Sequence, residues 1–224
     1  MAFYHETSGG RTNDSFGEEP VERGGIVSEI DAGLNAIIKL EGFVEFSHSV
    51  TDLNLHSNAL TTMKGVGALS LLVNLNLSSN FIEKMDSDEL WQCTRLTRLN
   101  LACNRITEMD GLSGLQSLEY LNVAHNQIHS LEAMKQCSPA HVLKDLDLKG
   151  NRINNLEELL ALKRCPTLRQ LTLARKGKVA AETNQICAQR GYLQVVERCL
   201  PELALLDGEN FMETMQEARR QEGN

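Results

Sequence analysis

The sequence predicts an α/β solenoid, in which short units of similar sequence stack along one axis instead of surrounding a single core. Two observations predict this fold. The pattern L-x-x-L-x-L-x-x-N-x-I/L occurs five times, and its asparagines are 22, 24, 22 and 25 residues apart. Aromatic residues make up only 4% of the 224 residues while leucine is abundant, which is typical of a core built by repetition. The five asparagines are Asn58, Asn80, Asn104, Asn126 and Asn151.

Each L-x-L segment is expected to form a short strand, because alternate residues of a strand face opposite sides. The inward leucines then pack against those of the next repeat, so each repeat is stable only through its neighbours. The five asparagines are expected to bind backbone groups where the chain turns away from the strand, which is a structural role. A sixth copy, beginning at Leu168, keeps the strand but has Lys176 where the asparagine is expected.

The segments between the strands predict the outer, convex side of the solenoid. After each asparagine the pattern I/L-x-x-L/M-x-x-L favours short 3-10 turns, and residues 87–93 and 156–165 contain better helix formers. Ser87 is expected to cap the first of these helices. The expected fold therefore has a parallel β-sheet on its concave face and 3-10 or short α-helices on its convex face.

The chain is expected to divide into a repeat domain and two polar ends. Residues 1–22 are rich in Gly, Ser, Thr and Glu and are expected to be a disordered tail. The repeat domain covers 23–210, with an N-terminal cap formed by an atypical half-repeat over 26–46, repeats over 50–173 and a helical C-terminal cap over 174–210. Residues 211–224 are expected to form a polar helical tail, either the start of a coiled coil or a frayed end.

Composition disfavours several classes of partner. The formal net charge of −8 repels phosphate backbones, so direct nucleic-acid binding is not expected. No apolar run is long enough for a signal peptide or a membrane span, and neither end carries a lipidation motif, so we expect a cytoplasmic protein that binds no membrane. The six cysteines form no CxxC pair, which favours reduced thiols.

Catalytic motifs are missing as well. The sequence has no GxxxxGK[ST], GxGxxG or GxSxG segment. His125 and His129 are four residues apart, but they flank a turn and no further ligand stands at the usual spacing, so no metal site is expected. Cys103 is expected to be an inert thiol, because the pattern places no basic partner near it. We therefore predict no enzyme activity, no catalytic residue and no cofactor.

The C-terminal segment carries a motif of its own. A helix that begins at Tyr192 is followed by Leu200-Pro-x-Leu203-x-x-Leu206-Asp207. Together with the repeats, this resembles the SDS22-like class of intracellular leucine-rich-repeat proteins over residues 26–210. The resemblance implies a curved, right-handed leucine-rich-repeat solenoid with a helical C-terminal cap.

Three segments, 31–37, 143–153 and 184–192, are also similar to the N-terminal repeat domain of the centrosomal leucine-rich repeat and coiled-coil family. The sequence departs from that family at Asn184-Gln-Ile-Cys187, where the family has a proline, and the family's long coiled coil is absent from these 224 residues. This similarity implies a non-enzymatic scaffold of the centriole, basal body or axoneme, with cytoskeletal or centrosomal protein partners.

Two alternative functions stay open. One is a regulatory subunit of a protein phosphatase, as SDS22-like proteins are. That role typically uses a longer array with an acidic and aromatic concave face, and here Tyr120 is the one aromatic expected on that face. The other is an RNA-processing scaffold that holds an RNA-binding protein, which the acidic charge allows because the contact would be through protein.

The candidate partner-binding residues flank the inward leucines and should form rows across the concave face. Two interpretations stay open for the row of amides: neighbouring side chains that hydrogen-bond each other along the sheet, or a polar groove for a partner. Arg98 beside Tyr120 is either the anchor of an interface or a surface pair without a partner. The candidate residues are Asp52, Asn54, His56, Asn74, Asn76, Arg98, Asn100, Tyr120, Asn122, Asp145 and Asp147.

Acidic residues are expected at both ends of this face, with Asp52 at one end and Asp145 and Asp147 at the other. Such a groove favours a basic or mixed-charge ligand. We therefore expect the concave face to bind a helical or extended segment of a cytoskeletal protein.

Overall fold

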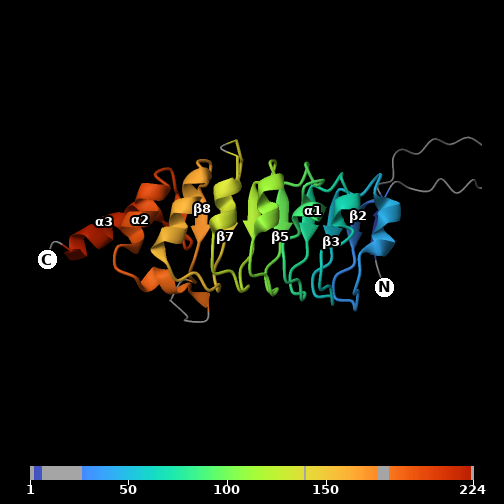
Figure 1. Ribbon diagram of the computed structural model, residues 1–224, viewed down its shortest axis with the longest axis horizontal. Helices are drawn as coiled ribbons and strands as arrows, with labels where there is room; N and C mark the ends of the chain where they lie inside the picture. Colours follow the sequence, from blue (N-terminus) through green and yellow to red (C-terminus); the bar gives the residue numbers. More distant parts are fainter. Residues whose placement is uncertain (1–2, 7–26, 139, 176–181, 223–224) are drawn as a thin grey trace, which may run out of the picture.

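The computed structural model describes residues 3–6, 27–138, 140–175 and 182–222, and within them ten strands form one sheet in the order β1 to β10. The strands from β2 to β9 run parallel, whereas β1 and β10 pair antiparallel at the two edges. Figure 1 shows the repeats stacked along the long axis, from the N-terminal end in blue to the C-terminal end in red. The strands are β1 (Phe3–Glu6), β2 (Val27–Asp31), β3 (Asp52–Asn54), β4 (Asn74–Asn76), β5 (Arg98–Asn100), β6 (Tyr120–Asn122), β7 (Asp145–Asp147), β8 (Gln170–Thr172), β9 (Leu205–Leu206) and β10 (Glu209–Asn210).

Short helices connect the strands, which confirms the predicted class of a curved leucine-rich-repeat solenoid with one parallel sheet. Most are 3-10 helices, as expected for connections this short. The helices are η1 (Glu41–Phe46), η2 (Val66–Ala68), α1 (Ser87–Leu90), η3 (Asp110–Gly114), η4 (Glu132–Gln136), η5 (Leu156–Arg164), η7 (Gln185–Ala188), α2 (Tyr192–Cys199) and α3 (Phe211–Glu222).

The register of the sheet aligns one apolar residue of every parallel strand. These residues are all buried, so each strand covers the apolar side chain of the next, as the repeat pattern predicts. The aligned residues are Ile30, Leu53, Leu75, Leu99, Leu121, Leu146, Leu171 and Leu206.

The repeat asparagines join successive repeats through their amides. Asn104 donates from Nδ2 to the carbonyl oxygens of Leu77 and Leu101, each at 3.0 Å, and its Oδ1 accepts from the Ile82 N–H at 2.9 Å. The other four make the same three contacts in their own repeats. Their structural role is thus confirmed, because the backbone groups that they bind would otherwise be buried without partners.

The sixth repeat also has its asparagine, which corrects the sequence analysis. Asn184 is fully buried; it donates to the carbonyl oxygens of Leu148 and Leu173 at 2.8 Å and accepts from the Ile153 N–H at 3.1 Å. These are the contacts that Asn104 makes three repeats earlier. Ten residues, 174–183, separate Asn184 from Leu173, whereas two separate Leu101 from Asn104, and Lys176 lies outside the described residues.

The N-terminal half-repeat is more regular than expected. β2 pairs in parallel with β3, and Ile30 and Ala32 are buried where later repeats have leucines. Asn35 stands in the asparagine position and donates to the carbonyl oxygens of Ala32 and Gly33 at 2.9 and 2.8 Å. Segment 27–37 is therefore the sheet part of a further repeat.

The expected disordered tail over residues 1–22 is wrong for residues 3–6. They form β1, which pairs antiparallel with β2 and covers that edge of the sheet. Residues 1–2 and 7–22 of the expected tail lie outside the described residues.

The C-terminal motif replaces the contacts that a following repeat would supply. Asp207 Oδ1 accepts from the N–H groups of Leu173 and Ala174, at 2.7 and 2.8 Å. In an earlier repeat the Leu101 N–H donates to the Asn122 carbonyl oxygen of the next strand, and the Ala102 N–H donates to Asn100 Oδ1 of its own strand. A single carboxylate therefore ends the sheet's hydrogen-bond pattern.

The cap continues beyond residue 210, where its boundary was expected. α3 begins at Phe211, and Asn210 caps it by accepting from the Met212 N–H at 3.1 Å. Phe211 and Met215 are each 2% exposed, since they pack four residues apart on one face of the helix. The helical part of the expected tail is thus fastened to the cap by its first two turns.

The cap of α1 differs by one residue from the expected one. Ser87 is the first residue of α1, and Asp86 before it is the cap, with Oδ1 accepting from the Asp88 N–H at 3.0 Å. Asn155 caps η5 in the same way through the Glu157 N–H. Either acceptor satisfies an N–H at the start of a helix, so the sequence offers two neighbouring choices at 86 and 87.

Candidate protein-binding surface

The parallel register brings the sequence-predicted residues together in rows. The first row is defined by Asp52, Asn74, Arg98, Tyr120 and Asp145, one from each strand from β3 to β7. The second row, two residues further along each strand, is defined by Asn54, Asn76, Asn100, Asn122 and Asp147.

Sequence reasoning missed one residue in each row. Glu29 and Asp31 of β2 align with Asp52 and Asn54 of β3. The signal was present, because Asn35 lies 23 residues before Asn58, within the spacing of the other repeats. The rows therefore begin one strand earlier, with two more carboxylates.

A hollow of about 370 Å³ follows the N-terminal part of these rows, over β2 to β6. Asp145 and Asp147 are outside it, although both belong to the predicted rows. Its polar lining comprises Glu29, Asp31, Asp52, Asn54, Asn74, Asn76, Arg98, Asn100 and Tyr120.

The second row uses its side-chain oxygens within each strand. Oδ1 of Asn76 accepts from the Ser78 N–H, and Oδ1 of Asn100 accepts from the Ala102 N–H, both at 3.1 Å. Asp31, Asn54, Asn122 and Asp147 accept in the same way from the N–H two residues on. The ladder along the sheet, one of the two interpretations above, is seen between Asn54 Nδ2 and Asp31 Oδ1, 3.2 Å apart.

This arrangement leaves amide donors on the groove side. Among the described residues, no hydrogen bond uses Nδ2 of Asn76 or of Asn100, and both residues line the hollow. The oxygen is held by the backbone, so the orientation of each amide is fixed. The two NH₂ groups are therefore positioned to donate to a partner.

Arg98 and Tyr120 form a stacked pair at one end of the hollow. The guanidinium carbon of Arg98 lies 4.5 Å from the centroid of the Tyr120 ring, which is a cation–π contact. The Tyr120 hydroxyl accepts from Asn122 Nδ2 at 3.4 Å. Arg98 is exposed, and its guanidinium donates no hydrogen bond within the described part of the chain, so its planar set of donors is open to a ligand.

His56 lies just beyond the second row, at the end of β3. Its Nδ1 is 3.0 Å from the Ser57 hydroxyl. The ring packs over Gly33, where an added Cβ would lie 2.5 Å from it. Gly33 thus lets His56 cover the end of β2, and His56 borders the hollow without lining it.

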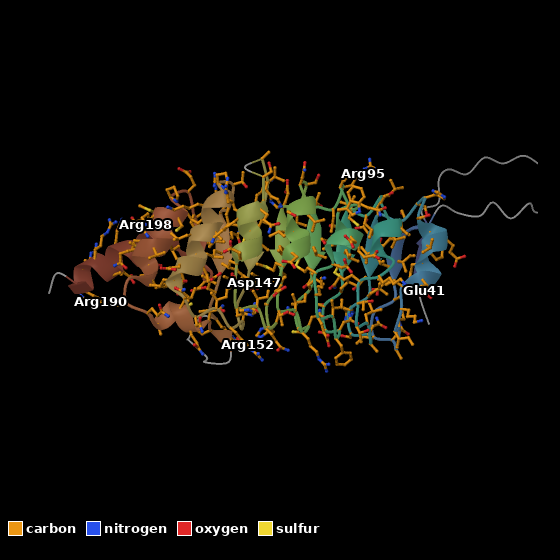
Figure 2. All side chains as sticks on the ribbon, in the orientation of Figure 1. Glu41, Arg95, Asp147, Arg152, Arg190 and Arg198 are labelled. Carbon is orange, nitrogen blue, oxygen red and sulfur yellow. The ribbon has the colours of Figure 1, made fainter. Side chains whose placement is uncertain are left out.

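The two acidic ends of the rows are electrostatically different. Asp147 forms an ion pair with Lys149 at 2.8 Å. In Figure 2, Asp147 lies over the middle of the array, whereas Arg95 and Arg152 lie at its opposite edges. Burial raises the pKa of the Asp145 carboxyl, Asp147 raises it further, and the Arg98 charge opposes both. Asp52 accepts from Asn74 Nδ2 and from the Thr51 hydroxyl, both neutral donors.

Three buried thiols have raised pKa values. Burial raises the pKa of Cys93 and of Cys137 to about 11 and that of Cys165 to about 12. They are therefore protonated at neutral pH and are poor nucleophiles. All six cysteines are free.

Within the part of the chain that the structure describes, no three His, Cys, Asp or Glu side chains are grouped so that they could hold a metal ion. No described helix is long and apolar enough to cross a membrane.

Comparison with known proteins agrees with the fold. A family model described as leucine rich repeat matches residues 70–128 and 94–153. No curated protein matches the sequence.

The solved structures that resemble the chain include two internalins of Listeria monocytogenes. InlF is 20% identical, with a TM-score of 0.64 over 82% of this chain and 48% of its own, so this chain spans about half of its length. Internalin C2 is 23% identical, with a TM-score of 0.54 over 71% of this chain and 73% of its own.

A Drosophila melanogaster SNF/U2A′ complex contains a third similar chain. It is 21% identical, with a TM-score of 0.54 over 66% of this chain and 79% of its own. Because all three sequences are less than 25% identical to this chain, their structural similarity shows a shared leucine-rich-repeat fold and nothing more.

Proposed function

We propose that this leucine-rich-repeat protein is a non-enzymatic scaffold that binds a partner protein on its concave face. Leucine-rich-repeat domains generally mediate protein–protein interaction. The observation that carries the proposal here is the Arg98–Tyr120 pair, which stands beside a hollow with an open set of guanidinium donors.

The geometry of this pair suits an interface hot spot. Arg and Tyr are enriched among the residues that dominate binding energy at interfaces. The ring holds the guanidinium in place before binding, which lowers the entropy lost when a partner docks. Asn76 and Asn100 add two oriented amide donors beside it.

We propose a centriole, basal body or axoneme as the place of action, with a cytoskeletal or centrosomal partner in the cytoplasm. This rests on the similarity of segments 31–37, 143–153 and 184–192 to the centrosomal family. A phosphatase regulatory subunit and an RNA-processing scaffold are the alternatives. The neighbour from Drosophila was solved as the SNF/U2A′ complex, so a chain of similar fold is part of an assembly there.

The test compares two cation–π pairs of the same chain. Arg98→Ala with Tyr120→Ala removes the pair on the concave face, and Arg105→Ala with Phe81→Ala removes a second pair with a 4.7 Å separation in the connecting loops. Tagged proteins are expressed in ciliated cells, and their partners are quantified by proximity labelling. We expect the concave variant to lose the main partners by at least about tenfold, equivalent to about 1.4 kcal/mol, and the loop variant to keep them.

Equal labelling by both variants would contradict the concave-face proposal, provided that both melt at the wild-type temperature. Microscopy of the same tag separates the alternatives. Foci at centrioles or axonemes support the proposal, diffuse co-localisation with a phosphatase supports the first alternative, and nuclear speckles support the second.

A further inference from the structure

We propose that the partner is a helical segment with a basic side chain and, two turns along, an acidic one, and that it lies across the strands in a single direction. Its basic side chain would face β2 and β3, and its acidic side chain would face Arg98. This inference rests on the proposed function, because it names the chemistry of the partner on that same face.

The uncompensated negative charge lies at the N-terminal end of the hollow. Glu29, Asp31 and Asp52 line it, and none of them forms an ion pair with a lysine or arginine among the described residues. Asp31 and Asp52 are oriented by neutral donors, the amides of Asn54 and Asn74. Such donors hold a carboxylate in place and leave its charge available to a cation.

The other acidic end differs. Lys149 pairs with Asp147, and both Asp145 and Asp147 lie outside the hollow. The groove therefore has a direction that the sequence does not reveal. A cation is attracted to β2 and β3, and the open guanidinium at β5 attracts a carboxylate.

The spacing between the two charges suits a helix. Asp52 on β3 and Arg98 on β5 are two strand spacings apart, about 10 Å. Side chains at positions i and i+7 of an α-helix are on one face and about 10.5 Å apart along its axis. A partner helix that lies across the strands would thus place its basic residue next to Asp52 and its acidic residue next to Arg98.

The backbone pattern of the sheet also favours a helix over an added strand. Extended segments bind by hydrogen-bonding to a free sheet edge, whereas a helix satisfies its own backbone groups. Here the hollow lies over β2 to β6, and none of these strands is an edge of the sheet. The concave face offers side chains only, which are what a helix needs.

The direct test uses synthetic helical peptides of about 20 residues, long enough to hold helical structure in water. The probe carries Arg at one position and Glu seven residues later on the same face, with a nitroxide label beside the Arg. Titration into isotope-labelled protein is followed by NMR. We expect the label to broaden the side-chain amide signal of Asn54 more than that of Asn122. The opposite pattern, or no binding at about 1 mM peptide, would overturn the proposal.

Charge neutralisation supplies a matched control. The triple variant Glu29→Gln, Asp31→Asn and Asp52→Asn keeps one acceptor oxygen on each side chain while it removes three charges. The control Glu83→Gln, Glu108→Gln and Asp110→Asn removes three charges from exposed residues outside the rows. We expect about tenfold weaker peptide binding by the first variant, weaker still with added salt, and wild-type binding by the control.

Three outcomes would count against this inference without touching the proposed function. The first is equal weakening by both triple variants, which would indicate a general charge effect. The second is a dimer in sedimentation that the concave triple variant abolishes, which would make a second copy of the chain the occupant. The third is loss of cellular partners by the Arg98/Tyr120 variant while the peptide fails to bind, in which case only the charge pattern proposed for the partner is wrong.

Discussion

The two ends of the solenoid solve the same problem with different residues. At the N-terminal end the chain uses a complete strand, β2, and covers it with the antiparallel β1. At the C-terminal end it uses Asn184 after an insertion, the carboxylate of Asp207 and the packed helices α2 and α3. The comparison teaches that a repeat array is closed either by more sheet or by single polar side chains that replace the missing backbone.

The largest expected effect is at the last asparagine. Asn184→Ala leaves the Ile153 N–H buried without a partner. It also removes one of the two hydrogen bonds to each of the carbonyl oxygens of Leu148 and Leu173, which keep the Asn151 amide and the backbone N–H of residue 184. We expect the free energy of unfolding to fall by about 3 kcal/mol, because an orphaned N–H costs about 1 kcal/mol or more and each lost hydrogen bond about 1 kcal/mol. Urea unfolding followed by circular dichroism measures this change. A loss below about 1 kcal/mol would mean that Asn184 is not equivalent to the asparagines of the other repeats.

The next effect concerns the carboxylate that ends the sheet. Asp207→Ala removes the acceptor for the Leu173 and Ala174 N–H groups, and we expect a loss of about 2 kcal/mol. Asp207→Asn is the control, since it keeps one acceptor oxygen and should lose less. Hydrogen exchange should show faster exchange at Leu173 and Ala174 than at Leu55 and Leu77. Uniform acceleration along the whole array would contradict the local role.

A smaller effect is a pH dependence of stability that is expected to come from the C-terminal half of the solenoid. His141, in the C-terminal half, is 1% exposed, and burial lowers the pKa of its imidazole, although the Leu112 backbone opposes this. The unfolded chain therefore binds the proton more readily, so stability is lost as the pH falls through about 6.5. Replacing His141 with Leu should remove this pH dependence, as measured by urea midpoints between pH 7.5 and about 5. His56→Leu, at a partly exposed position in the N-terminal half, is the control. If the urea midpoint of the His141 variant still changed with pH as in the wild type, other groups would be the cause of the pH dependence.

The smallest effect is expected at the first asparagine. Asn35 donates to Ala32 and Gly33 within its own repeat and is only half-buried, so water can replace it in part. Asn35→Ala should cost about 1 kcal/mol or less in the same urea experiment. A cost equal to that of Asn184→Ala would mean that the two ends depend on their asparagines alike.

The sequence predicted those parts of the fold in which the same residue types recur at the same spacing. Leu53, Leu75 and Leu99 align because every repeat needs the same inward side chain. Asn184 was not predicted because the segment 174–183 is longer than its counterparts and moves the asparagine away from the expected position. The segment that contains β2 was interpreted as half a repeat because Ala32 stands where leucine is usual. Local residue patterns contain no information about such insertions, which become visible only when hydrogen bonds are followed across repeats.

The candidate surface was predictable in its rows but not in its electrostatics. Alternation along each strand placed Arg98 beside Tyr120, and the structure brings them into contact. Whether the amides bind each other or their own backbone depends on side-chain torsions, which the pattern of residue types does not fix. The difference between Asp52 and Asp147 likewise depends on Lys149, whose side chain the sequence does not orient.

Site-specific photo-crosslinking tests most directly the claim that the concave face binds a partner. A photoreactive residue is placed at Asn76 or Asn100, whose amides face the hollow, and in a control at the exposed Glu108. We predict that both groove positions crosslink in cells to the same partner, that Glu108 does not, and that Arg98→Ala with Tyr120→Ala abolishes the crosslinks. Crosslinks from Glu108 alone, with none from either groove position, would contradict the account and move the binding site to the outer side of the solenoid.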